Sequence, residues 1–139
     1  MPGSLSRDAL VDALNALLSA ELAGAKVAVE SLREVADGPQ KTLLDQVHYG
    51  EADSCRRLRH CLKHLGAEPT REVGAFHAKA MAIEDLGERL AFVDRGQRWV
   101  IRKVGELLAT PLDAPIREEL EAVLRTHETN SEAAVALSP

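Results

Sequence analysis

Apolar residues recur along the chain at intervals of three and four, the spacing that places side chains on one face of an α-helix. Three segments rich in Gly, Pro and Asp interrupt this repeat, at 37–40, 65–70 and 110–115. The repeat between them predicts four helices, at about 7–36, 40–65, 77–109 and 115–137. A chain of 139 residues with this pattern is expected to form one all-α domain over residues 1–139.

The connections between these helices suggest how they pack. Short connections make the first and second helices, and the third and fourth, antiparallel neighbours, so two helical hairpins are expected to form a four-helix bundle. The segment from Gly66 to Phe76 is longer: about eleven extended residues reach about 36 to 40 Å, nearly the length of a 26-residue helix. This segment could therefore be a crossover, which leaves the order of helix directions open.

Polar residues interrupt the apolar stripe at the middle of every predicted helix. Glu21 is in line with the leucines of the first helix, and Glu51 and Cys55 interrupt the second. The third and fourth helices carry the same kind of interruption, at Asp94, Gln97, His127 and Asn130. Antiparallel helices align residues that are equally distant from their connection, and by this count the interruptions within each hairpin match in height. The pattern predicts one buried polar layer halfway along the bundle.

Burial of a carboxylate without a partner costs several kcal/mol, so the acids of this layer need partners that neutralise them or donate hydrogen bonds to them. Carboxylates and an imidazole that project inward from facing helices are the components of a metal site in a helical bundle. Oxygen and nitrogen ligands suit iron, manganese or zinc, and a cation would offset the repulsion between two glutamates. The predicted ligands are Glu21, Glu51 and His127, with Cys55 and Asp94 as candidate additional ligands.

The same layer also allows interpretations without a metal. Glu21 and Glu51 can form a protonated or hydrogen-bonded pair that specifies helix register, in a helical interaction or scaffold module with a buried polar network. Cys55 can be a small core residue or the thiol of a redox sensor. Gln97 and Asn130 are expected to hydrogen-bond to the ligands rather than to bind the ion, because amides are weak donors to transition metals.

The two glutamates lie in the segments "LLSAELAGA" (Glu21) and "GEADSCRRLRHCLKHLGAEP" (Glu51), which resemble the first-helix and second-helix glutamate segments of the ferritin-like superfamily. The segments "KAMAIEDLGERLAFVDRGQRWVIRK" and "THETN" are similar to a small, uncharacterised bacterial ferritin-like family. This resemblance implies a ferritin-like four-helix bundle that binds metal, with a role in redox or metal-stress handling.

The chain departs from the di-metal pattern of that superfamily, which has Glu on two helices and Glu-x-x-His on the other two. Ser54 stands three residues after Glu51, where the pattern has His, and Leu124 stands three before His127, where it has Glu. The candidates for the third-helix acid are Asp94, Glu84 and Glu88. The resemblance therefore implies a degenerate site, mononuclear or weaker than a full oxidase or ferroxidase centre.

Composition narrows the class of protein further. Apolar residues make up 45% of the chain and aromatic residues 3%, which favours helices over a strand-rich sandwich. The formal net charge of −5 argues against nucleic acid as a partner, because proteins that bind phosphates usually carry a basic surface. No apolar run approaches the length of a membrane span, about 18 to 20 residues, and the N-terminus lacks a secretory signal. We expect a cytoplasmic protein without a membrane partner.

Two further expectations concern the thiols and the assembly. Cys55 and Cys61 would lie six residues apart on one helix, about 9 Å along its axis, which is too far for a disulfide. They are expected to be reduced thiols.

Many small helical bundles form dimers, so a homodimer is expected.

Overall fold

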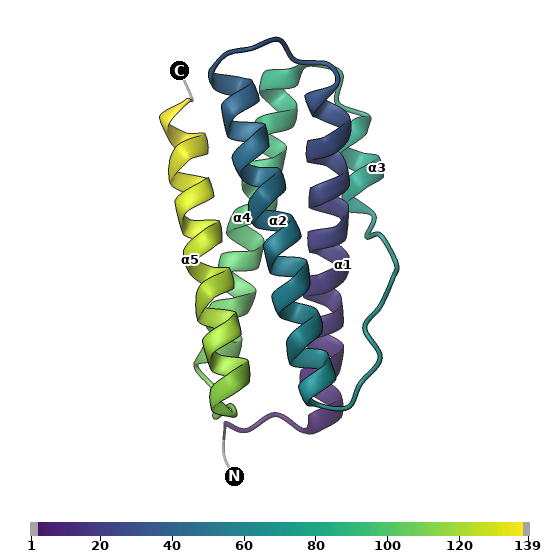
Figure 1. Ribbon diagram of the computed structural model, residues 1–139, viewed down its shortest axis with the longest axis vertical. Coiled ribbons are helices and arrows are strands. Elements are labelled where there is room, and N and C mark those ends of the chain that lie inside the picture. The colour runs from purple at the N-terminus through teal and green to yellow at the C-terminus, as the bar shows by residue number, and fades with distance from the viewer. Residues whose placement is uncertain (1–2, 138–139) are drawn as a thin grey trace.

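The computed structural model describes residues 3–137 and contains five helices packed together, with no strand in that range. The helices are α1 (Arg7–Leu32), α2 (Pro39–His64), α3 (Phe76–Met81), α4 (Leu86–Leu108) and α5 (Ala114–Ala136). Figure 1 shows the four long helices side by side, with the short α3 on the outside of the bundle. The predicted all-α fold is confirmed for the described residues. Nowhere in that range is a helix long and apolar enough to cross a membrane.

Each long helix contacts two other long helices. α1 contacts α2 and α4, and α5 contacts the same two helices on their other side. In the view of Figure 1 the chain runs upward in α1 and α5 and downward in α2 and α4. Neighbouring long helices therefore run in opposite directions all the way around the bundle.

The segment 66–75 connects α2 to α3 along the outside of α1 (Figure 1). The backbone N–H of Gly74 donates to the carbonyl of Ser19, 3.2 Å away, and the N–H of Thr70 donates to Oδ1 of Asn15, 2.8 Å away. These bonds attach the connection to α1 and satisfy backbone groups that would otherwise need water. The connection carries the chain from the end of α2 back to the middle of α1, and α3 continues toward the opposite end of the bundle (Figure 1).

Two helix boundaries follow directly from local chemistry. α2 ends in a Schellman arrangement, in which the N–H of Ala67 donates to the carbonyl of Leu62 and the N–H of Gly66 donates to that of Lys63, both at 2.9 Å. Gly66 has a φ of 69°, which L side chains rarely adopt. At the start of α1, the Ser6 side chain accepts a hydrogen bond from the N–H of Ala9, 3.1 Å away.

The prediction of one continuous helix over 77–109 is wrong, because α3 ends at Met81 and α4 begins at Leu86. Asp85 caps α4, since its carboxylate accepts a hydrogen bond from the N–H of Glu88, 2.9 Å away. The buried guanidinium of Arg89 donates twice to the carbonyl of Ile83 inside the break, at 2.8 and 2.9 Å. The apolar repeat continues across the break and therefore did not reveal it. α1 also ends at Leu32, four residues before the predicted end at 36.

The core consists of two apolar clusters, one toward each end of the bundle. The first is built around residues such as Leu14, Leu58 and Leu120, and the second around residues such as Val27 and Leu44. Buried polar residues lie between these positions on every long helix: Glu21, Glu51, Gln97 and His127. A polar layer therefore divides the core at its middle.

Candidate metal centre

Three buried side chains from three different helices meet in the polar layer. Glu21 on α1, Glu51 on α2 and His127 on α5 are 1%, 4% and 0% exposed. One carboxylate oxygen from each glutamate and one ring nitrogen of the histidine all lie within 4.8 Å of one another. We call these three residues the Glu–Glu–His cluster. Its donor atoms are the type and number that could hold a metal ion.

The orientation of the His127 ring is set by its own helix. Nδ1 lies 2.8 Å from the carbonyl of Val123, which can only accept a hydrogen bond, so Nδ1 carries a proton. Nε2 then faces the carboxylates, 2.8 Å from Oε1 of Glu21 and 3.7 Å from Oε2 of Glu51. A backbone carbonyl on the far ring nitrogen is the usual support of a metal-binding histidine. The ring is thereby held with Nε2 as the possible ligand atom.

The carboxylates are only partly satisfied. Nε2 of Gln97, on α4, donates to Oε1 of Glu51 at 2.5 Å. Neither Oε2 of Glu21 nor Oε2 of Glu51 accepts a hydrogen bond from any group that the structure describes, although both are buried. A buried oxygen of this kind costs about 1 to 3 kcal/mol, and more when it is charged. A cation, or a proton held between the two carboxyl groups, would remove this cost.

Three residues of the predicted layer lie outside the cluster. Asp94 accepts a hydrogen bond from the Ser131 hydroxyl at 2.7 Å and pairs with Arg98 at 3.0 Å. Asn130 accepts a hydrogen bond from Gln46 at 3.1 Å, and Cys55 packs in the first apolar cluster; both are buried. Since three helical residues rise about 4.5 Å, Asp94 and Gln97 cannot both lie level with Glu51, and α4 places Gln97 there.

Two helical glycines that the sequence analysis did not single out allow the polar groups to approach. A Cβ atom at Gly24 would lie 2.9 Å from the carboxylate carbon of Glu51. A Cβ atom at Gly50 would lie 2.7 Å from Nδ2 of Asn130 and from Cγ2 of Thr126. Glycine inside a helix costs about 1 kcal/mol relative to alanine, so its presence at these positions was the available signal of close packing.

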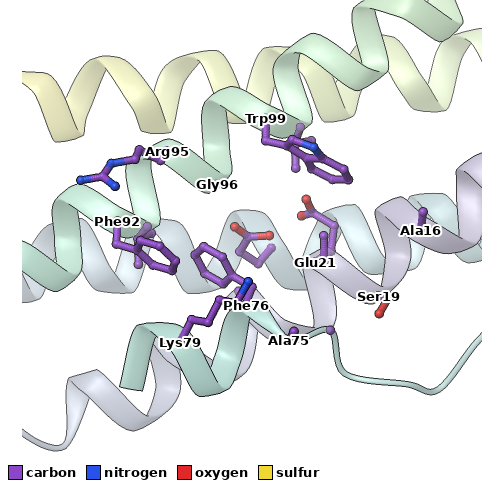
Figure 2. Close-up of a pocket in the computed structure, with 16 residues that line it drawn as sticks. Ala16, Ser19, Glu21, Ala75, Phe76, Lys79, Phe92, Arg95, Gly96 and Trp99 are labelled. Atoms are coloured by element: carbon purple, nitrogen blue, oxygen red, sulfur yellow. The ribbon is translucent and has the colours of Figure 1, made fainter. Parts of the chain in front are cut away.

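A cavity of about 500 Å³ opens beside the cluster, and both Glu21 and Glu51 line it. Its other walls come from α4 and from the segment between Gly74 and Lys79. Figure 2 shows the Glu21 side chain pointing from α1 toward α4, with Trp99 on one side and Phe76 on the other. We call this space the aromatic cavity. Helix periodicity does not predict this cavity, because one of its walls belongs to the crossover.

A family model described as "Domain of unknown function (DUF6306)" matches residues 8–136. The chain belongs to this family. No curated protein and no solved structure matches it. The matched range contains all residues of the Glu–Glu–His cluster as well as Gln97, so the cluster is part of the DUF6306 domain.

Burial and mutual charge shift the pKa values of all three groups of the Glu–Glu–His cluster in this DUF6306 domain. Burial, reinforced by the charge of Glu51, raises the pKa of Glu21 well above its ordinary value. Burial also acts to raise the pKa of Glu51, but its close polar contacts with Glu21 and His127, the charge of His127 and the hydrogen bond from Gln97 outweigh burial and lower that pKa. Burial acts to lower the pKa of His127, but the two glutamates outweigh it and raise that pKa well above its ordinary value. Without a metal, the cluster therefore retains protons, which a bound cation would displace.

The two thiols of the domain are free, as predicted, and both are buried. Burial raises the pKa of both thiols to about 12, aided at Cys55 by the charges of Glu21 and Glu51 and at Cys61 by that of Glu119. The thiolate is the reactive form, so neither thiol should react with iodoacetamide in native protein at about pH 8. Mass spectrometry should find both thiols alkylated only after unfolding in urea. Rapid native alkylation of Cys55 would contradict this prediction and support a thiol sensor.

Proposed function

We propose that this chain is a ferritin-like protein that binds one divalent transition-metal ion through Glu21, Glu51 and His127. The observation that carries the proposal is the Glu–Glu–His cluster itself, whose ligand atoms converge from three helices. Two of its buried oxygens accept no hydrogen bond within the described chain, which is the arrangement that a cation would satisfy.

The donor set favours iron or manganese over the other candidates. Two carboxylates and one imidazole form a harder set of ligands than the thiolates and imidazoles of structural zinc sites. Cys55, the soft ligand that would favour zinc, is not among the converging atoms of the cluster. A divalent ion would neutralise the two carboxylates and would keep open positions for a further ligand.

The path of the chain supports the ferritin-like part of the proposal. Neighbouring long helices alternate in direction, and one long connection joins the first pair of helices to the second (Figure 1). The helix α4 supplies an amide, Gln97, to Glu51 where the di-metal pattern of that superfamily has an acid. The set of strong ligands therefore suffices for one ion rather than two. The role that we propose for this ion, redox or metal-stress handling, is the one that the ferritin-like resemblance implies.

Elemental analysis tests the proposal. Protein purified without chelators, or incubated with Fe²⁺ or Mn²⁺ and desalted, is expected to carry about one ion per chain, because the three ligands define one site. A Glu21→Ala, Glu51→Ala double variant should lose the ion. Asp94→Asn is the matched control, since it removes a buried charge of α4 that lies outside the cluster but retains an oxygen for Ser131. Wild-type protein that stays free of added Fe²⁺, Mn²⁺ and Zn²⁺ would refute the proposal.

A further inference from the structure

The aromatic cavity has the features of a small-molecule site. Its volume of about 500 Å³ falls within the range of ligand pockets, about 300 to 1,000 Å³. Two buried carboxylates line it, and each has an oxygen without a hydrogen-bond donor in the described chain. The cavity therefore connects the Glu–Glu–His cluster to a space that a molecule could enter.

Aromatic residues are concentrated around this cavity. The chain has only two Phe, one Trp and one Tyr, and three of these four residues, Phe76, Phe92 and Trp99, line the cavity. All three are partly exposed rather than buried in the core. The rings of Phe76 and Phe92 stack with centroids 4.8 Å apart and planes at 13°. Each ring packs against one of the apolar clusters but keeps part of its surface exposed, and this exposed part can contact a planar ligand in the cavity.

A close approach of side chain to backbone forms one wall of the cavity. A Cβ atom at Gly96 would lie 3.0 Å from the Phe76 ring, so the ring rests directly on the backbone of α4. The opposite wall, on α1, presents small side chains at Ala16 and Ala20. The cavity therefore offers aromatic faces on one side and little bulk on the other, which suits a flat apolar body.

Two cationic side chains add a charge preference. Lys79, on α3, and Arg95, on α4, line the cavity and are exposed. Neither forms an ion pair with a carboxylate within residues 3–137, and the Arg95 guanidinium instead lies 5.9 Å from the Phe92 ring centroid. These two cations make the outer end of the cavity positive and attract an anionic group there, whereas the carboxylates of Glu21 and Glu51 line its inner end.

We propose that the aromatic cavity binds a small aromatic anion, with its ring against Trp99 and Phe76 on the open side of the Glu21 carboxylate and its charged group toward Lys79 and Arg95. The inference rests on the proposed function in one respect: the bound molecule would be the one presented to the metal site. The carboxylates at the inner end and the cations at the outer end orient the anion with its charge away from Glu21 and Glu51 when no ion is bound.

The single tryptophan permits a direct test. Trp99 is the only Trp of the chain and lines the cavity, so its fluorescence reports on the occupant. The probe is 8-anilinonaphthalene-1-sulfonate, an aromatic anion that accepts energy from tryptophan, added to the full chain after dialysis against chelator. We expect saturable, one-site quenching of Trp99. A Lys79→Ala, Arg95→Ala double variant should raise the Kd about tenfold at low salt.

Three controls separate the cavity from general surface binding. The Arg59→Ala, Lys63→Ala double variant removes the same charges from exposed positions of α2 and should leave the Kd unchanged. The uncharged probe N-phenyl-1-naphthylamine should bind wild type and the Lys79, Arg95 variant equally. Ala20→Leu, whose side chain enters the cavity, should abolish the binding of both probes while thermal unfolding confirms that the variant is folded.

The outcomes distinguish this inference from the proposed function. Quenching that does not saturate, that survives Ala20→Leu, or that weakens equally in the Arg59, Lys63 variant would overturn the inference. The same titration with Mn²⁺ present, together with elemental analysis of bound Mn²⁺, tests the metal site separately. Probe binding without Mn²⁺ binding would support the cavity proposal and refute the metal site. Mn²⁺ binding without probe binding would support the metal site and refute the cavity proposal.

Discussion

Replacement of His127 by leucine is expected to lower the free energy of unfolding of the metal-free protein by about 3 to 5 kcal/mol. His127 is fully buried and supplies the hydrogen bond to Oε1 of Glu21 and the ion pair with Oε2 of Glu51. Leucine would fill the space but leave both carboxyl groups without this partner. Removal of one member of a buried charged pair costs this much because the remaining charge is uncompensated. Urea unfolding followed by circular dichroism measures the change.

Two further variants test whether the loss of stability comes from the unpaired buried carboxyl groups. A Glu21→Leu, His127→Leu double variant removes both members of the closest pair and should be more stable than His127→Leu alone. His60→Leu changes an exposed histidine that pairs with Glu119 and should alter the free energy of unfolding by less than about 0.5 kcal/mol. If His127→Leu keeps or raises stability, the cluster is not a set of interdependent charges, and the metal-free scaffold becomes the better interpretation.

Replacement of Arg89 by methionine is expected to lower the free energy of unfolding by about 2 to 4 kcal/mol. The buried guanidinium donates to the carbonyl of Ile83, to the hydroxyl of Ser31 at 3.1 Å, and to the carboxylate of Glu34. Methionine retains most of the apolar packing but leaves the fully buried Ser31 hydroxyl without this donor. Arg89 thereby joins the break between α3 and α4 to the end of α1. Thermal and urea unfolding measure the loss.

Arg98→Met is the matched control on the same helix. Arg98 pairs with the buried Asp94 but is itself 62% exposed, so water reaches this pair and its loss should cost less than the loss of the buried Arg89 bonds. The difference between the two variants isolates the buried bonds from the general effect of losing a positive charge on α4. Equal stability of Arg89→Met and Arg98→Met would show that the buried guanidinium does not hold the break in place.

Most of the fold was predictable from the sequence, because helix periodicity and helix-breaking residues are local signals. The breaks around Gly38, Gly66 and Pro111 predicted the ends of the long helices to within a few residues. The division of 77–109 into α3 and α4 was not predictable from that signal. It depends on Arg89 reaching back to Ile83 and across to α1, which are tertiary contacts that apolar spacing does not encode.

The homodimer expected from the sequence stays a prediction.

The candidate site, like the fold, was predictable only in part from local signals. Counting residues from the connections predicted a shared layer for Glu21, Glu51 and His127, because the rise per residue of a helix is constant. The same count could not choose between Asp94 and Gln97. That choice depends on the position of α4 along its axis relative to α2, which the packing of whole helix faces decides.

By itself, therefore, the sequence determined that the chain is helical, that its helices are amphipathic, and that polar groups interrupt each stripe at one height. Only the tertiary structure decided which of those groups meet, that Gly24 admits the Glu51 carboxylate, and that the crossover brings Phe76 against α4 to enclose a cavity. The physical reason is that periodicity specifies the face of a helix on which a residue lies. Contact between faces depends on helix rotation, close approach and the path of the connections, which are properties of the assembled bundle.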